Sequence, residues 1–163
     1  MLKKFKFEEF KLFCETKLKE WGMYSPAAVD VLLMICAHES LGTKYRKQIN
    51  GPALGVFQME PPTHDSIWAN SDTIKSRAKK LNITKDVSKL ANDDAYALFL
   101  ARHYMAMDPK PLPKDLVSAS HWCRGYWNGA GFNPDGTAKI EGGGKATPEE
   151  YLRDYNLWKQ GKL

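Results

Sequence analysis

Glu39 is a carboxyl group at the end of an otherwise apolar stretch of the chain, 31–37. Leu32, Cys36 and Glu39 are spaced by four and three residues, so in a helix they share one face. A carboxyl group at the end of a buried helix is partly desolvated, and desolvation raises its pKa. A carboxylic acid that stays protonated near neutral pH can act as a general acid. The alternative is that Glu39 turns into solvent as an ordinary surface residue.

The helix that carries Glu39 has clear signals at both ends. Ser25 is a good N-cap and Pro26 suits the first helical position. Gly42 can end the helix because it adopts a positive φ without a clash. His38 and Glu39 also match the start of a His-Glu-x-x-His zinc motif, but Gly42 stands where the second His is required. We therefore expect no metal site here, and His38 is expected to be a hydrogen-bonded neighbour of the site.

Two further motifs follow in the chain. His38-Glu39-Ser40 is followed by Gly55-Val56-Phe57-Gln58 and then by Trp127-Asn128-Gly129. In this order they resemble the Glu-Ser, Gly-Leu-Met-Gln and Tyr-Asn-Ala-Gly motifs of lytic transglycosylases and goose-type lysozymes. The three motifs span residues 38–131, which is most of the chain.

The chain departs from this family pattern in two places. Phe57 replaces the usual Met before Gln58, and two aromatic residues, Tyr126 and Trp127, precede Asn128 where the family has one. Neither change removes a reacting group. Which of the two aromatic residues lines the site stays open, and so does the chemical form of the product.

The resemblance implies a peptidoglycan-cleaving enzyme that acts on the β-1,4 bond between N-acetylmuramic acid and N-acetylglucosamine. Glu39 would protonate the leaving oxygen and then act as base while the C6 hydroxyl closes onto C1, giving a 1,6-anhydro product. Ser40 would support Glu39, and no cofactor is implied. The residues expected to contact the glycan are His38, Ser40, Gln58, Glu60, Tyr126, Trp127 and Asn128.

Hydrolysis of a glycosidic bond usually takes two carboxyl groups. Glu60, Asp65, Asp93 and Asp94 are available as partners of Glu39, and none has a decisive position in the sequence. A hydrolytic lysozyme of the same fold therefore remains the first alternative. A non-catalytic wall-binding or virion structural protein is the second.

Length and composition predict one globular domain, residues 1–163, with 43% hydrophobic residues. The net charge of +5 favours polyanionic partners, either an acidic cell wall or nucleic acid. The basic residues are spread along the chain without interleaved aromatics, so the wall is favoured and nucleic acid is not expected. Three cysteines, an odd number, argue against a disulfide framework.

The first nine residues are charged and lack an apolar core, so no signal peptide is expected. The longest apolar run, 31–37, is far shorter than the roughly 20 residues of a membrane span. With the motif resemblance and the small size of the chain, these features favour a monomeric bacteriophage lytic enzyme that is made in a host cytoplasm; an origin in a bacterial chromosome is the alternative. Such an enzyme reaches the wall after holin-mediated release, as an endolysin, or as part of a virion.

Hydrophobic periodicity and cap residues predict a mostly α domain. The motif resemblance implies that this domain has a lysozyme-like fold. An irregular or short β segment is expected near 45–60, where Gly and Pro are frequent. The expected helices lie near 4–21, 25–42, 64–70, 71–81, 92–107, 116–127 and 147–160.

Overall fold

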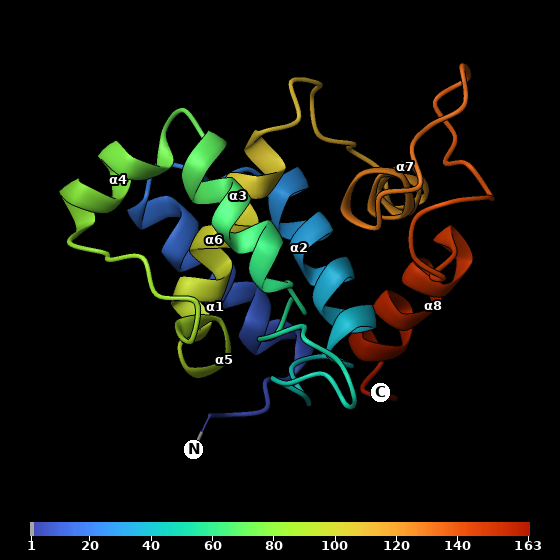
Figure 1. Ribbon diagram of the computed structural model, residues 1–163. Helices are drawn as coiled ribbons and strands as arrows, with labels where there is room; N and C mark the ends of the chain where they lie inside the picture. The colour runs from blue at the N-terminus through green and yellow to red at the C-terminus, as the bar shows by residue number, and fades with distance from the viewer. Residues whose placement is uncertain (1) are drawn as a thin grey trace.

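The helix α2 (Pro26–Glu39) runs through the middle of the molecule (Figure 1). Every residue from 31 to 37 is buried, because an apolar sequence on all sides of a helix is stable only when the helix is surrounded. It packs against α1 (Phe7–Glu20), α6 (Asp94–Ala106), α7 (Leu116–Trp122) and α8 (Pro148–Lys159). This central position fixes the end of α2, where Glu39 lies.

The computed structural model describes residues 2–163. It is mostly helical, as the sequence predicts. The remaining helices are α3 (Pro61–Asn70), α4 (Ile74–Leu81), α5 (Lys89–Asn92) and the π-helix η1 (Cys123–Trp127). Trp158 near the C-terminus donates a hydrogen bond to the Phe5 carbonyl and so joins the two ends of the chain. The Phe5 N–H in turn donates to Thr43, just beyond the end of α2.

The predicted caps are confirmed at three helices. Ser25 accepts from Ala28 N at α2, Asp93 accepts from Tyr96 N at α6, and Thr147 forms a capping box with Glu150 at α8.

Several predicted boundaries were wrong. Helix α3 begins at Pro61 instead of His64, since a proline at the first helical position needs no N–H partner. The predicted helix 116–127 is interrupted, because its last turn widens into η1. Gly125 lies in this turn, where an added Cβ would collide with the Phe132 ring. The one-turn helix α5 carries no sequence signal that we used.

The segment 45–60 has only isolated β-bridges, which agrees with the predicted short β segment. Lys47 pairs with Leu54, and Leu54 pairs with Met59, both antiparallel. A buried ion pair holds this segment against α6: Arg46 donates through Nε and a terminal nitrogen to both carboxylate oxygens of Asp94, at 3.0 and 2.8 Å. The segment is therefore irregular but anchored.

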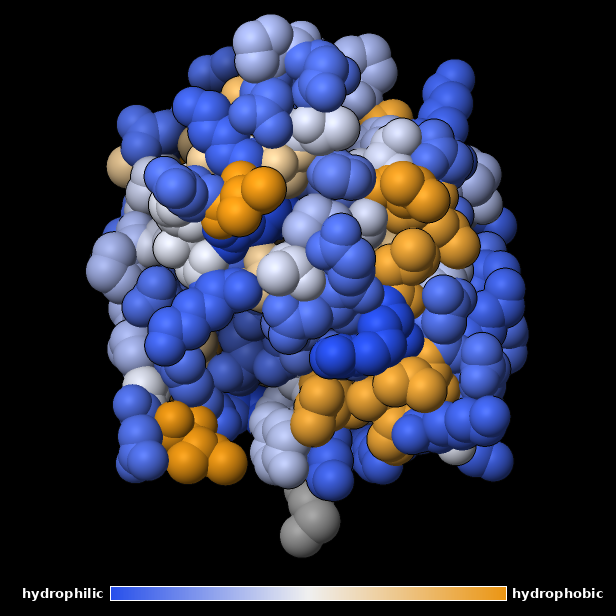
Figure 2. Space-filling view, turned by 90° about the vertical axis from the view of Figure 1, so that its right-hand side faces the viewer, coloured by the Kyte–Doolittle hydropathy of each residue, from blue (hydrophilic) through white to orange (hydrophobic). Residues whose placement is uncertain are grey.

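The three cysteines are buried and unpaired, in agreement with the sequence prediction. No helix within residues 2–163 combines the length and the apolar character that a membrane span requires. On the face formed by α7, α8 and the loop between them, apolar side chains form separate patches within a largely hydrophilic surface (Figure 2).

Candidate active site

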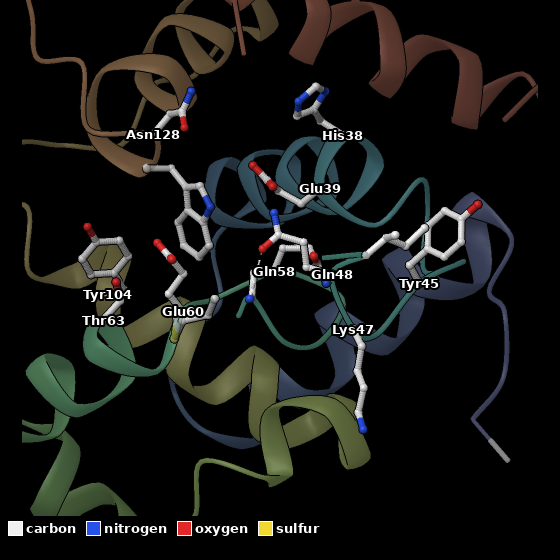
Figure 3. A pocket seen from close by; sticks show the side chains of 14 residues that line it. His38, Glu39, Tyr45, Lys47, Gln48, Gln58, Glu60, Thr63, Tyr104 and Asn128 are labelled. Atoms are coloured by element: carbon white, nitrogen blue, oxygen red, sulfur yellow. Dashed lines mark hydrogen bonds between the residues drawn. The ribbon is translucent and has the colours of Figure 1, made fainter. Parts of the chain in front are cut away.

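A cleft of about 580 Å³ opens at the end of α2. Its walls come from this helix end, the segment 45–60, the start of α3 and the end of η1 (Figure 3). Six of the predicted site residues line it: His38, Glu39, Gln58, Glu60, Trp127 and Asn128. Lining residues that the sequence did not suggest are Tyr45, Lys47, Gln48, Ile49, Ala53, Met59, Thr63 and Tyr104.

Glu39 is half-buried and faces this cleft. Burial raises its pKa above the ordinary value, while the nearby His38 and a hydrogen bond from Tyr151 partly oppose that rise. The Tyr151 hydroxyl donates to Glu39 Oε1 at 3.0 Å. Tyr151 is fully buried on α8, 112 positions away in the sequence, and its spacing within that helix is that of a core residue. No local signal could have identified it.

The Tyr151 hydroxyl provides a direct test of how the carboxyl group of Glu39 is tuned. Its hydrogen bond favours the carboxylate, so Tyr151→Phe is expected to raise the pKa of Glu39 further. If Glu39 is a general acid, the alkaline limb of the pH–activity profile then moves to higher pH. Tyr155→Phe is the matched control, because Tyr155 lies one turn further along α8 and bonds Asp30 instead. An unchanged alkaline limb in Tyr151→Phe would contradict the assignment.

His38 is fixed by a buried carboxylate. Its Nδ1 lies 2.8 Å from Asp154 Oδ2, and the Asp154 side chain is only 6% exposed. The imidazole also packs on the Tyr151 ring, with 4.6 Å between centroids. His38 therefore holds α8 to the end of α2 and braces the tyrosine that bonds Glu39.

Gln58 projects from a tight turn of the 45–60 segment. Its backbone has φ +48°, and its side-chain Nε2 donates to the Gly55 carbonyl at 2.9 Å. Gly55 is required here, because an added Cβ would collide with the Leu90 carbonyl oxygen. The side-chain nitrogen of Gln58 is thus engaged, whereas its side-chain oxygen, Oε1, makes no hydrogen bond within the part of the chain that the structure describes. It is available to a ligand.

The structure separates the two aromatic residues that precede Asn128. Trp127 lines the cleft, with its ring edge-to-face against Tyr104 at 5.3 Å. Tyr126 does not line it: the ring stacks on Trp122 at 4.8 Å, and the hydroxyl donates to the Tyr104 carbonyl at 2.7 Å. The predicted glycan contact of Tyr126 is therefore corrected to a packing role, because the two side chains leave η1 in different directions.

Asn128 is held by the glycine-rich loop that follows it. Its Nδ2 donates to the Ala146 carbonyl at 3.3 Å, and its backbone carbonyl accepts from Gly144 N at 2.9 Å. Arg124, which is almost fully buried, fixes the same loop by donating to four backbone carbonyls, those of Lys139, Ile140, Gly142 and Gly144. Arg124 was not singled out in the sequence, where an arginine between aromatic residues has no distinctive pattern.

Ser40 does not reach the cleft. It is fully buried, where its hydroxyl donates to the Cys36 carbonyl at 3.1 Å and accepts from Thr43 N at 3.1 Å. The predicted contact with substrate is thus corrected. Ser40 closes the end of α2 and so supports Glu39 through the backbone.

Glu39 and Glu60 are the two carboxyl residues that line the cleft. The other candidate partners are engaged elsewhere: Asp65 bonds His64, Asp93 caps α6, and Asp94 pairs with Arg46. Glu60 is exposed at the start of α3. Among residues 2–163, no group of three or more His, Cys, Asp or Glu side chains is arranged to hold a metal ion.

No protein-family model, curated protein or solved structure matches this chain.

Proposed function

We propose that this protein is a lysozyme-like enzyme that cleaves the β-1,4 bond between N-acetylmuramic acid and N-acetylglucosamine in peptidoglycan. The observation that carries the proposal is the half-buried Glu39, whose pKa is raised by burial and whose side chain faces an open cleft. Burial shifts this carboxyl group toward its protonated form, which is the form that a general acid uses. The motif resemblance supplies the substrate class.

In the proposed reaction, Glu39 donates its proton to the glycosidic oxygen as the bond from that oxygen to C1 breaks. The resulting Glu39 carboxylate then removes the proton of the C6 hydroxyl group. As this proton leaves, the C6 hydroxyl oxygen forms a bond to C1. The proton returns to Glu39 and the product is a 1,6-anhydro sugar. The hydrogen bond from Tyr151 stabilises the carboxylate formed between the two steps.

The remaining side chains of the cleft suit a sugar. The indole of Trp127 offers a flat apolar surface to the C–H face of a pyranose ring, and the amides of Gln58 and Asn128 can orient hydroxyl and acetamido groups. His38 lines the same wall and is held by Asp154. Such a site fits a phage endolysin or a virion enzyme, which we include in the proposal.

Hydrolysis by a lysozyme mechanism is the alternative chemistry, and Glu60 favours it as a second carboxyl in the same cleft. Mass spectrometry of digested peptidoglycan distinguishes the two reactions. Muropeptides lighter by one water are expected, and they identify a transglycosylase that needs Glu39 alone. Free reducing ends would assign hydrolysis and make Glu60 the second carboxyl. Intact glycan after prolonged incubation would contradict both mechanisms.

A further inference from the structure

Within the irregular segment 45–49, the bridge residue Lys47 presents an open backbone edge beside the cleft. Gly55 N donates to the Arg46 carbonyl at 2.7 Å, and Gln48 N donates to the Ala53 carbonyl at 2.9 Å. In an antiparallel pair, the backbone groups of the residue between them point to the opposite side. That residue is Lys47, and its N–H and C=O make no hydrogen bond with any residue from 2 to 163. Such an edge is ready to pair with an extended chain.

The side chains on this edge are apolar and cationic. Tyr45, Lys47 and Ile49 all line the cleft. Ile49 is 75% exposed and Tyr45 38%, so both side chains are accessible to a ligand at the cleft. Lys47 has no carboxylate partner within residues 2–163. Figure 3 shows Tyr45 and Lys47 projecting at the rim, away from Glu39.

The edge is anchored to the body of the protein at Arg46. Between Tyr45 and Lys47, the Arg46 side chain is anchored on Asp94 and also donates to the backbone carbonyls of Thr43 and Lys3. A fixed backbone loses little conformational entropy on binding, so the hydrogen bonds that it forms contribute more to affinity.

We propose that the edge 45–49 binds, by strand addition, the short acidic peptide carried by the muramic acid of the glycan. One residue of an extended peptide would accept from Lys47 N–H and donate to Lys47 C=O, while a peptide carboxylate meets the Lys47 ammonium group. Apolar side chains of the peptide would cover Ile49 and Tyr45. This proposal rests on the proposed function, which places the glycan in the adjoining cleft.

Proline at position 47 isolates the backbone contact. The Lys47 N–H takes no part in the bridge to Leu54, so Lys47→Pro removes the outward donor and leaves the internal hydrogen bonds in place. Lys47→Gln removes only the charge and keeps the backbone donor. Lys159→Gln, a change at the end of α8, controls for net charge. Thermal unfolding of each variant verifies that the fold is kept.

The experiment has two readouts. The first is binding of a soluble muramoyl peptide to the Glu39→Gln protein, measured by calorimetry with and without the Lys47 substitutions. Loss of one hydrogen bond corresponds to about 1 kcal/mol, so Lys47→Pro is expected to weaken binding about fivefold. Lys47→Gln is expected to weaken it mainly at low salt. The second readout is the ratio of cleavage rates for peptide-bearing and amidase-stripped glycan, which should fall toward one in both variants.

Equal cleavage of the two glycans by the unsubstituted protein would overturn the docking proposal, as would unchanged peptide binding in Lys47→Pro. Failure of the proposed function gives a different result, namely that neither glycan is cleaved. The binding readout needs no catalysis and still decides whether the edge binds the peptide. If Lys47→Pro unfolds, the salt dependence of peptide binding by Lys47→Gln tests the proposal instead. Peptide binding by Lys47→Gln that equals that of the protein with Lys47 at every salt concentration would contradict it.

Discussion

Replacing Glu39 with glutamine is expected to reduce peptidoglycan cleavage by roughly 10²–10⁴-fold, the usual contribution of a general acid. Glutamine keeps the size and the polarity of the side chain but has no proton to give to the leaving oxygen. Turbidity loss of purified cell walls measures the rate. Glu141→Gln, on the exposed glycine-rich loop, is the matched control and should clear walls normally. A Glu39→Gln protein with full activity would exclude the proposed mechanism.

The same substitution has a predictable effect on stability. Burial raises the pKa of Glu39 in the folded protein, so this residue contributes stability below its unfolded-state pKa and loses that contribution as the pH rises through the folded-state value. Glutamine cannot ionise and loses nothing over this range. The free energy of unfolding of Glu39→Gln, relative to the unsubstituted protein, is therefore expected to increase with pH. Urea unfolding at two pH values on either side of this range tests the sign.

A Glu39→Gln protein that is inactive but has a higher free energy of unfolding would show that the carboxyl group is retained at a cost to stability. An inactive variant that has unfolded would carry no such information, so binding to cell walls by co-sedimentation accompanies the assay. The non-catalytic alternative gives a separate result, in which the unsubstituted protein and Glu39→Gln bind walls equally and neither releases muropeptides.

The helical architecture was predictable because its signals are local. The apolar run 31–37, the Ser25 and Thr147 caps and the periodicity of α6 each specify an element from neighbouring residues. The π-turn η1 was not predictable in the same way. Gly125 in this turn lies against the Phe132 ring, a contact with a residue beyond the helix that the local helical pattern does not encode.

The residues of the candidate site also differ in whether a local signal in the sequence identifies them. Glu39, Gln58 and Asn128 belong to short motifs, and a motif brings its own signal in the sequence. Tyr151 and Arg124 act through contacts between distant segments, and their side chains have the spacing of ordinary helix residues. Ser40 shows the converse error, because membership of a motif does not state which way a side chain points.

Removing the Asp94 carboxylate is expected to lower the free energy of unfolding by roughly 3 kcal/mol, since it leaves the Arg46 guanidinium buried without its counter-charge. The two side chains are only 13% and 9% exposed, so water screens this pair little. Urea unfolding of Asp94→Ala measures the loss, with the exposed Asp72→Ala as control. Adding Arg46→Met to Asp94→Ala should recover part of the lost free energy of unfolding, because the double variant contains neither charge of the pair. A loss below 1 kcal/mol would mean that the hydrogen bonds of Arg46 to Thr43 and Lys3 hold the cleft edge by themselves.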